Sequence, residues 1–108
     1  MKVRWNKQSK EHLRQTARYI RQEFGERAMD EFMQVVQHTN DLLADNPRLG
    51  FVEPLLSDLT TQYRSIVVRR LNKIVYCIAD NYIKVVAFWD CRREPQSQAS
   101  QIDYSGKV

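Results

Sequence analysis

The stretch IKVVAFWDCRREP, residues 83–95, decides the fold class because an apolar run ends there abruptly in charged residues. Residues 83–89 are rich in β-branched and aromatic side chains, which favours a strand. Alternation along this strand separates an apolar set from a mixed set: Ile83, Val85, Ala87 and Trp89 against Lys84, Val86, Phe88, Asp90 and Arg92. We expect the apolar set to face helices. The mixed set, with Val86 and Phe88 among cations, predicts a docking surface.

Two similar runs precede this strand, at residues 63–68 and 73–79. Short joins at Leu71-Asn72 and Asp80-Asn81 separate the three runs. Joins of this length predict antiparallel hairpins. A short strand over residues 3–5 opens the chain and adds to the same sheet.

The segment between the first strand and these hairpins has helical periodicity. Apolar residues recur at steps of 4, 3 and 4 from Leu13 to Phe24, and Asn6 or Ser9 can cap the start. Gly25 predicts a stop, and a second apolar pattern runs over residues 28–43 until Asn46-Pro47 ends it. The sequence therefore predicts an α+β fold in which a helical hairpin packs on one face of a sheet.

Length and composition predict one domain over residues 1–108, with a polar tail at 96–108. The chain has 43% hydrophobic and 28% charged residues, and no apolar stretch is long enough to span a bilayer. Its first ten residues lack the apolar middle of a signal peptide, so we expect a cytoplasmic protein without a membrane partner. The formal charge of +4 favours a polyanion or an acidic protein as partner.

Positive charge gathers in the predicted sheet, on Arg64, Arg69, Arg70, Lys73, Lys84, Arg92 and Arg93. Tyrosines at 63, 76 and 82 and Phe88 lie among these cations. Basic residues beside aromatic rings are what single-stranded nucleic acid requires. The alternative interpretation is a solvated face whose charges protect the sheet edges.

Metal and thiol chemistry have little support in the sequence. His12 and His38 lie on different predicted helices, and no paired Cys or His spacing exists, so we expect no metal site and no cofactor. Cys91 stands beside Arg92 and Arg93, which favours a lowered thiol pKa. No histidine is near it in the sequence, so we interpret it as an ordinary free cysteine.

Several short strings, in order, resemble the RelE/ParE superfamily of toxins from bacterial type II toxin–antitoxin systems, over about residues 3–95. They are the strand with Trp5, Phe24-Gly25, Asn-Pro-x-x-Gly at 46–50, Glu53-Pro54-Leu55, Tyr63-Arg64, Lys-Ile-Val-Tyr at 73–76 and Asp-x-Arg-Arg-x-Pro at 90–95. The resemblance implies a β-α-α-β-β-β order with a twisted, mostly antiparallel sheet. It also implies a cognate antitoxin, for which Val86 and Phe88 are the expected seat.

The resemblance implies two activities, because RelE-like members cut mRNA on the ribosome whereas ParE-like members poison DNA gyrase. For metal-independent RNA cleavage it implies Glu53 as the base, with Arg64, Lys73 and Arg92 as cations around the reacting phosphate. The expected contacts to the RNA backbone are Arg69, Arg70, Lys84 and Arg93. Cys91-Arg92 replaces the His-Tyr pair of one nuclease branch.

The string around Glu53 favours a ribosome-dependent endoribonuclease that inhibits translation, with the ribosome and mRNA as partners. A gyrase inhibitor that is not a nuclease is the alternative. An inactive relative that only binds antitoxin is a third.

Overall fold

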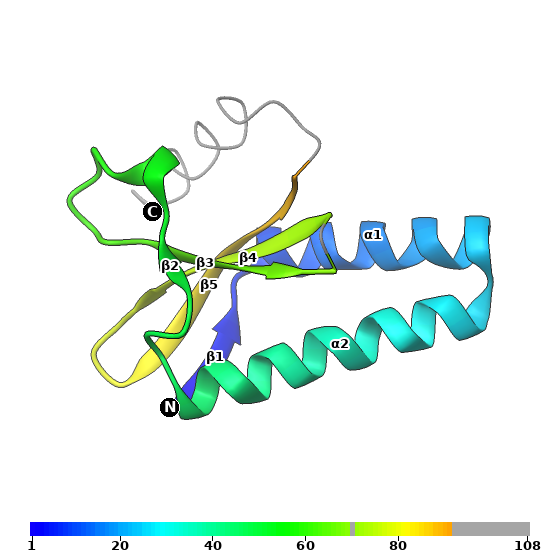
Figure 1. The fold of residues 1–108 in the computed structure, drawn as a ribbon, viewed down its shortest axis with the longest axis horizontal. Helices are drawn as coiled ribbons and strands as arrows, with labels where there is room; N and C mark the ends of the chain where they lie inside the picture. The colour runs from blue at the N-terminus through cyan, green and yellow to red at the C-terminus, as the bar shows by residue number, and fades with distance from the viewer. Residues whose placement is uncertain (70, 92–108) are drawn as a thin grey trace.

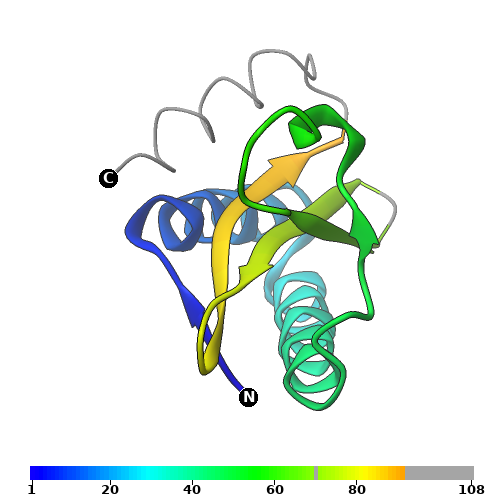
Figure 2. The ribbon, with the colours of Figure 1, turned by 90° about the vertical axis from the view of Figure 1, so that its left-hand side faces the viewer.

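The computed structural model describes residues 1–69 and 71–91, and there the chain forms two helices on one side of a five-stranded sheet (Figures 1 and 2). The helices are α1 (Lys7–Phe24) and α2 (Glu26–Asp45). The strands are β1 (Lys2–Trp5), β2 (Phe51–Val52), β3 (Arg64–Val68), β4 (Asn72–Ile78) and β5 (Tyr82–Asp90), and a 3₁₀ turn, η1 (Pro54–Leu56), follows β2. The predicted α+β fold with a helical hairpin on one face is confirmed.

The strand order in the sheet is β1-β5-β4-β3-β2. β1 pairs with β5 in parallel, and every other pairing is antiparallel. The two short joins correctly predicted the β3–β4 and β4–β5 hairpins. β2 was not predicted, because two residues are too few to show alternation. It pairs only with Arg64 and Ser65, so most of β3 has no neighbour on that side among the described residues.

Both helices begin and end at the polar and glycine residues from which their ends were predicted. The Asn6 side chain accepts a hydrogen bond from the Ser9 N–H at 2.8 Å, which makes Asn6 the cap of α1 rather than Ser9. Gly25 alone joins the helices, with φ at 94°, a backbone conformation that favours glycine. Asn46 ends α2.

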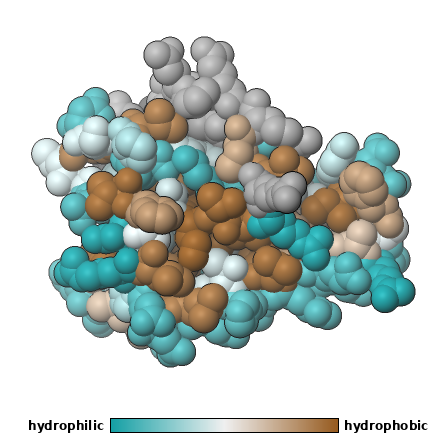
Figure 3. Space-filling model, in the orientation of Figure 1, coloured by the Kyte–Doolittle hydropathy of each residue, from teal (hydrophilic) through white to brown (hydrophobic). Residues whose placement is uncertain are grey.

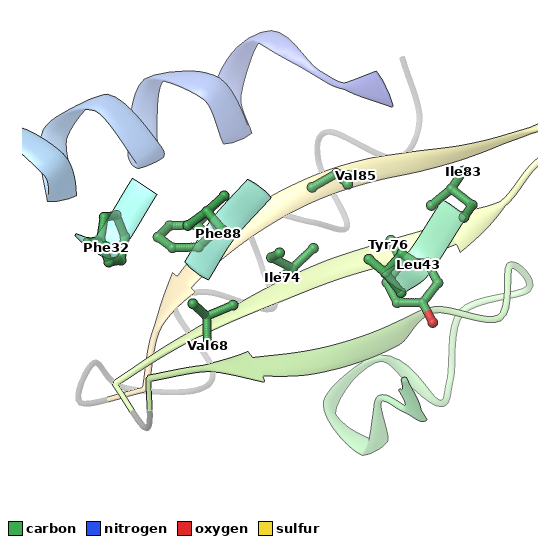
Figure 4. Close-up of a cluster of buried hydrophobic side chains, with 9 residues drawn as sticks. Phe32, Leu43, Val68, Ile74, Tyr76, Ile83, Val85 and Phe88 are labelled. Carbon is green, nitrogen blue, oxygen red and sulfur yellow. The ribbon is translucent and has the colours of Figure 1, made fainter. Parts of the chain in front are cut away.

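The inner core fills the space between the helices and the sheet (Figure 4). Phe88 lies at its centre, with its ring 5.7 Å from Trp5 and 6.1 Å from Phe32. The other buried members are Val36, Leu43, Val68, Ile74, Tyr76, Ile83 and Val85. β1, α2 and β5 therefore each supply one aromatic ring to the same contact.

A bulge in β5 overturns the predicted faces of this strand. Val75 pairs with Ala87 whereas Tyr76 pairs with Val85, so Val86 is an extra residue. Alternation inverts after such a residue. Ala87 and Trp89 therefore face away from the helices, and Phe88 faces them, so the prediction was wrong beyond Val86.

The sheet is apolar on its outer face as well. A second buried cluster lies there, made of Leu56, Tyr63, Val75, Cys77, Val86, Ala87 and Trp89. Leu56 and Leu59 come from the segment between β2 and β3. This segment covers part of the outer face, as the helices cover the inner one.

Candidate functional site

The predicted base, Glu53, lies in a buried polar cluster on the outer face. It caps η1, and only 1% of it is exposed. Its carboxylate accepts hydrogen bonds from Ser65 Oγ of β3 at 2.6 Å and from Lys73 Nζ of β4 at 2.8 Å. The Leu55 N–H adds a longer contact of 3.4 Å. The structure thus brings together two of the predicted catalytic residues, Glu53 and Lys73.

The electrostatics of this cluster favour an ionised carboxylate. Burial alone raises the pKa of Glu53, but the hydrogen bonds from Lys73 and Ser65 and the charge of Lys73 outweigh it. The pKa therefore lies below its ordinary value. Lys73 also lies over the Trp89 ring, 5.0 Å from its centroid. A carboxylate held in this way anchors the segment after β2 but accepts a proton poorly.

Arg64 belongs to a different cluster on the opposite side of β3. It donates to the Gly50 carbonyl at 2.9 Å, beside Tyr76, its cross-strand partner. The Tyr76 hydroxyl donates to the Pro47 carbonyl at 2.7 Å and accepts from the Gly50 N–H at 2.9 Å. Burial raises the pKa of Tyr76, although the Gly50 hydrogen bond and Arg64 oppose the rise. Arg64 and Tyr76 hold the turn after α2, away from Glu53.

The remaining predicted residues are scattered. Arg69 is exposed in the β3–β4 turn, with φ at 51°. Lys84 is half-buried on the outer face, opposite Cys77. Arg70, Arg92 and Arg93 lie outside the described residues.

Val86 and Phe88, the expected antitoxin seat, are each only 3% exposed. Phe88 packs in the inner core and Val86 in the outer one, on opposite faces of the sheet. The two side chains therefore do not form the single exposed surface that alternation had predicted.

Cys91 is exposed, and the pKa of its thiol lies above the ordinary value. Desolvation raises the pKa of Cys91, and Asp90 and Glu53 add to the rise, against the opposing charge of Lys73. The expectation of a lowered pKa from neighbouring cations was wrong. Within residues 1–69 and 71–91, no group of three or more His, Cys, Asp or Glu side chains could hold a metal ion. No helix in the same range is long and apolar enough to cross a membrane.

Sequence reasoning missed Ser65 and the exposed apolar edge of the sheet. Ser65 carries no signal by itself, because its role depends on the β2–β3 pairing that brings Glu53 beside it. At the β2–β3 edge, Phe51 is 82% exposed and Val67 58%, with Val52 also exposed. Figure 3 shows apolar side chains gathered over this region and surrounded by hydrophilic ones. We call Phe51, Val52 and Val67 the apolar edge.

Comparison with known proteins gives a match to a family model and matches to solved structures. The family model described as "ParE toxin of type II toxin-antitoxin system, parDE" matches residues 3–95. A chain in a solved structure titled "Chromosomal ParDE TA system from P. aeruginosa" is similar in fold, with a TM-score of 0.68. Its sequence identity is 13%, over 83% of this chain and 95% of that one. None of the curated protein sequences compared matches the chain significantly.

Proposed function

The chain belongs to the family of ParE toxins of type II toxin–antitoxin systems, and from this premise we propose that it acts by binding a target protein. The proposed target is DNA gyrase, the target that the resemblance to ParE-like members implies. A cognate antitoxin neutralises the toxin by binding it. We choose a protein target over RNA cleavage because of the burial and the ionisation of Glu53.

Metal-independent RNA cleavage needs a base that can reach a 2′-hydroxyl and take its proton. Glu53 is 1% exposed and its lowered pKa weakens it as a base. Ser65 and Lys73 both donate to Oε2 of Glu53, and these bonds give the side chain a structural role in the fold. These facts support a toxin that does not use Glu53 for catalysis.

The apolar edge supports a protein partner. Exposed apolar side chains surrounded by polar ones mark protein interfaces more often than solvated surface. Phe51 is large and extends into solvent, as expected of a residue that anchors a protein interface. The net charge of +4 also favours an acidic partner, such as an antitoxin tail.

Two assays on the purified full chain separate protein binding from cleavage. We expect the toxin to inhibit DNA supercoiling by gyrase and to leave mRNA intact on translating ribosomes. The toxin mixed with its cognate antitoxin is the control, and it should be inactive in both assays. Ribosome-dependent cleavage without an effect on supercoiling would contradict the proposal.

A ribosome-dependent endoribonuclease is the second candidate, and the cations of the outer face favour it. Lys73 and Lys84 both lie on this face, where RNA could approach. Under this hypothesis, Lys84→Gln reduces mRNA cleavage and has no effect on gyrase. If expression without antitoxin causes no growth arrest, the chain is an inactive relative and both candidates are wrong.

A further inference from the structure

A group of cations occupies the outer face of the sheet at the edge opposite the apolar edge. β1 and β5 pair in parallel, with Lys2 beside Tyr82 and Arg4 beside Lys84. Val3 and Trp5 pack toward the helices, so Lys2 and Arg4 lie on the outer face. We call Lys2, Arg4 and Lys84 the β1–β5 cation group.

Two further observations place these side chains on the same surface. The Arg4 guanidinium lies over the Tyr82 ring, 5.1 Å from its centroid. The charge of Lys84 lowers the pKa of Cys77, which is an outer-face residue, although burial raises it more. Arg4, Tyr82 and Lys84 therefore share the outer face.

The positive charge of this group has no acidic partner at ion-pair distance among the described residues. The ion pairs there involve other cations: Arg14, Arg18, Arg21, Arg27 and Lys73. Arg4 and Lys84 are also register neighbours across the parallel β1–β5 pair and lie on the same face, so their like charges repel each other. The fold therefore holds two like charges close together on the surface. This arrangement is expected if a bound anion neutralises the two charges.

We propose that the β1–β5 cation group binds the phosphate backbone of a nucleic acid, as a contact separate from the proposed protein-binding surface. Neighbouring strands are about 4.8 Å apart and alternate residues about 6.8 Å, so the group spreads its charges over a flat surface. Such a surface suits a row of phosphates. Positive charge of this kind contributes affinity without sequence preference.

An acidic protein segment is the competing occupant, and the distribution of apolar side chains disfavours it. Protein interfaces are organised around buried aromatic or aliphatic anchors. Such anchors are exposed at the apolar edge, and β4 and β5 lie between that edge and β1. The outward side chains of β1 are Lys2 and Arg4 alone.

The test measures binding of labelled single-stranded DNA, duplex DNA and RNA of equal length by fluorescence anisotropy, at several salt concentrations. The variant Lys2→Gln/Arg4→Gln/Lys84→Gln should bind at least about tenfold more weakly at 0.1 M salt. The slope of log K against log salt should fall by about 2–3, since each lost phosphate contact removes about 0.9. The three probes show which nucleic acid is preferred.

A matched control removes the same charge from the helical hairpin, as Arg18→Gln/Arg21→Gln/Arg27→Gln. These three arginines are exposed, as are Lys2 and Arg4, whereas Lys84 is half-buried. We expect both variants to stay folded, and thermal unfolding checks this. The conservative variant Lys2→Arg/Lys84→Arg should keep wild-type binding. Equal losses in both triple variants, or an unchanged salt slope, would overturn the proposal. So would binding of poly-glutamate with no binding of any nucleic acid.

Discussion

At the scale of single residues, Glu53 ties the segment after β2 to the sheet through charge. We expect Glu53→Gln to lower the free energy of unfolding by about 2–3 kcal/mol at pH 7.5. Removing one partner of a buried pair leaves the other unpaired, and Lys73 is only 20% exposed. Denaturant unfolding measures the change, with Glu31→Gln as the control because that ion pair lies on the surface. A loss as small as that of the control would show that the cluster contributes nothing to stability.

Acid should act on the same pair. Because the pKa of Glu53 is lower in the fold than its ordinary value of 4.5, its contribution is complete above that value. It is lost as the pH falls through the folded pKa. The wild-type chain should therefore lose more stability than Glu53→Gln when the pH falls below 4.5. Parallel pH curves for the two proteins would contradict this assignment of charge.

The short strings named Glu53 and Lys73 separately, as a base and as one of three cations, and did not predict that the two side chains form a buried ion pair. A Glu-Pro-Leu string has the same letters whether its carboxylate lies in an open cleft or in a buried core. The string therefore does not predict burial, because burial depends on which residues pack over the carboxylate in the fold. Arg64 and Tyr76 illustrate the same limit, because their contacts with the turn at Gly50 join residues 14 and 26 positions apart.

At the scale of elements, the one-residue link between the helices depends on glycine. We expect Gly25→Ala to lower the free energy of unfolding by about 1–2 kcal/mol, since φ at 94° strains a residue with a Cβ. Apart from the adjoining residues of the chain, no heavy atom lies within 4 Å of the added Cβ, so the cost is backbone strain and not a clash. Arg27→Ala, an exposed substitution two residues later, is the control for denaturant unfolding. Equal stability of the two variants would show that the hairpin relaxes at this link.

Helices were easier to predict than strands, for a local reason. The caps at Asn6, Gly25 and Asn46 act within one or two turns, so the sequence contains all the interactions that set them. The bulge at Val86 depends instead on how β4 and β5 pair, and no single residue in the sequence predicts it. The predicted faces of the β5 side chains are therefore correct up to Val85 and inverted from Ala87 onward.

At the scale of the whole molecule, the two edges of the sheet present different chemistry. The apolar edge lies at β2–β3, and the β1–β5 cation group lies at the other side. We expect Phe51→Ser to weaken binding to the antitoxin or to gyrase by about tenfold, because it removes a large anchor from the apolar edge. Stability should change by less than about 0.5 kcal/mol, since the ring is 82% exposed.

Isothermal titration with antitoxin and the supercoiling assay with gyrase provide the two measurements for this variant. Phe24→Ser is the control, because Phe24 is 69% exposed at the tip of the helical hairpin, away from the sheet (Figure 1). If Phe51→Ser keeps both activities while Phe24→Ser loses one, the interface lies on the hairpin and the apolar edge is not the contact.

The parallel pairing of β1 with β5 has a consequence for synthesis of the protein on the ribosome. Asn6 donates to the carbonyl of Val86, 80 positions later, and β1 pairs with β5, so the first strand cannot pair until the last described strand has been made. Until residues 82–85 leave the exit tunnel, the helical hairpin has only part of the surface that it covers in the finished fold. Domains whose contacts are distant in sequence fold late. A truncated translation product that stops before β5 therefore lacks the central neighbour of both β1 and β4, and a cell that makes such a fragment should not be harmed by it.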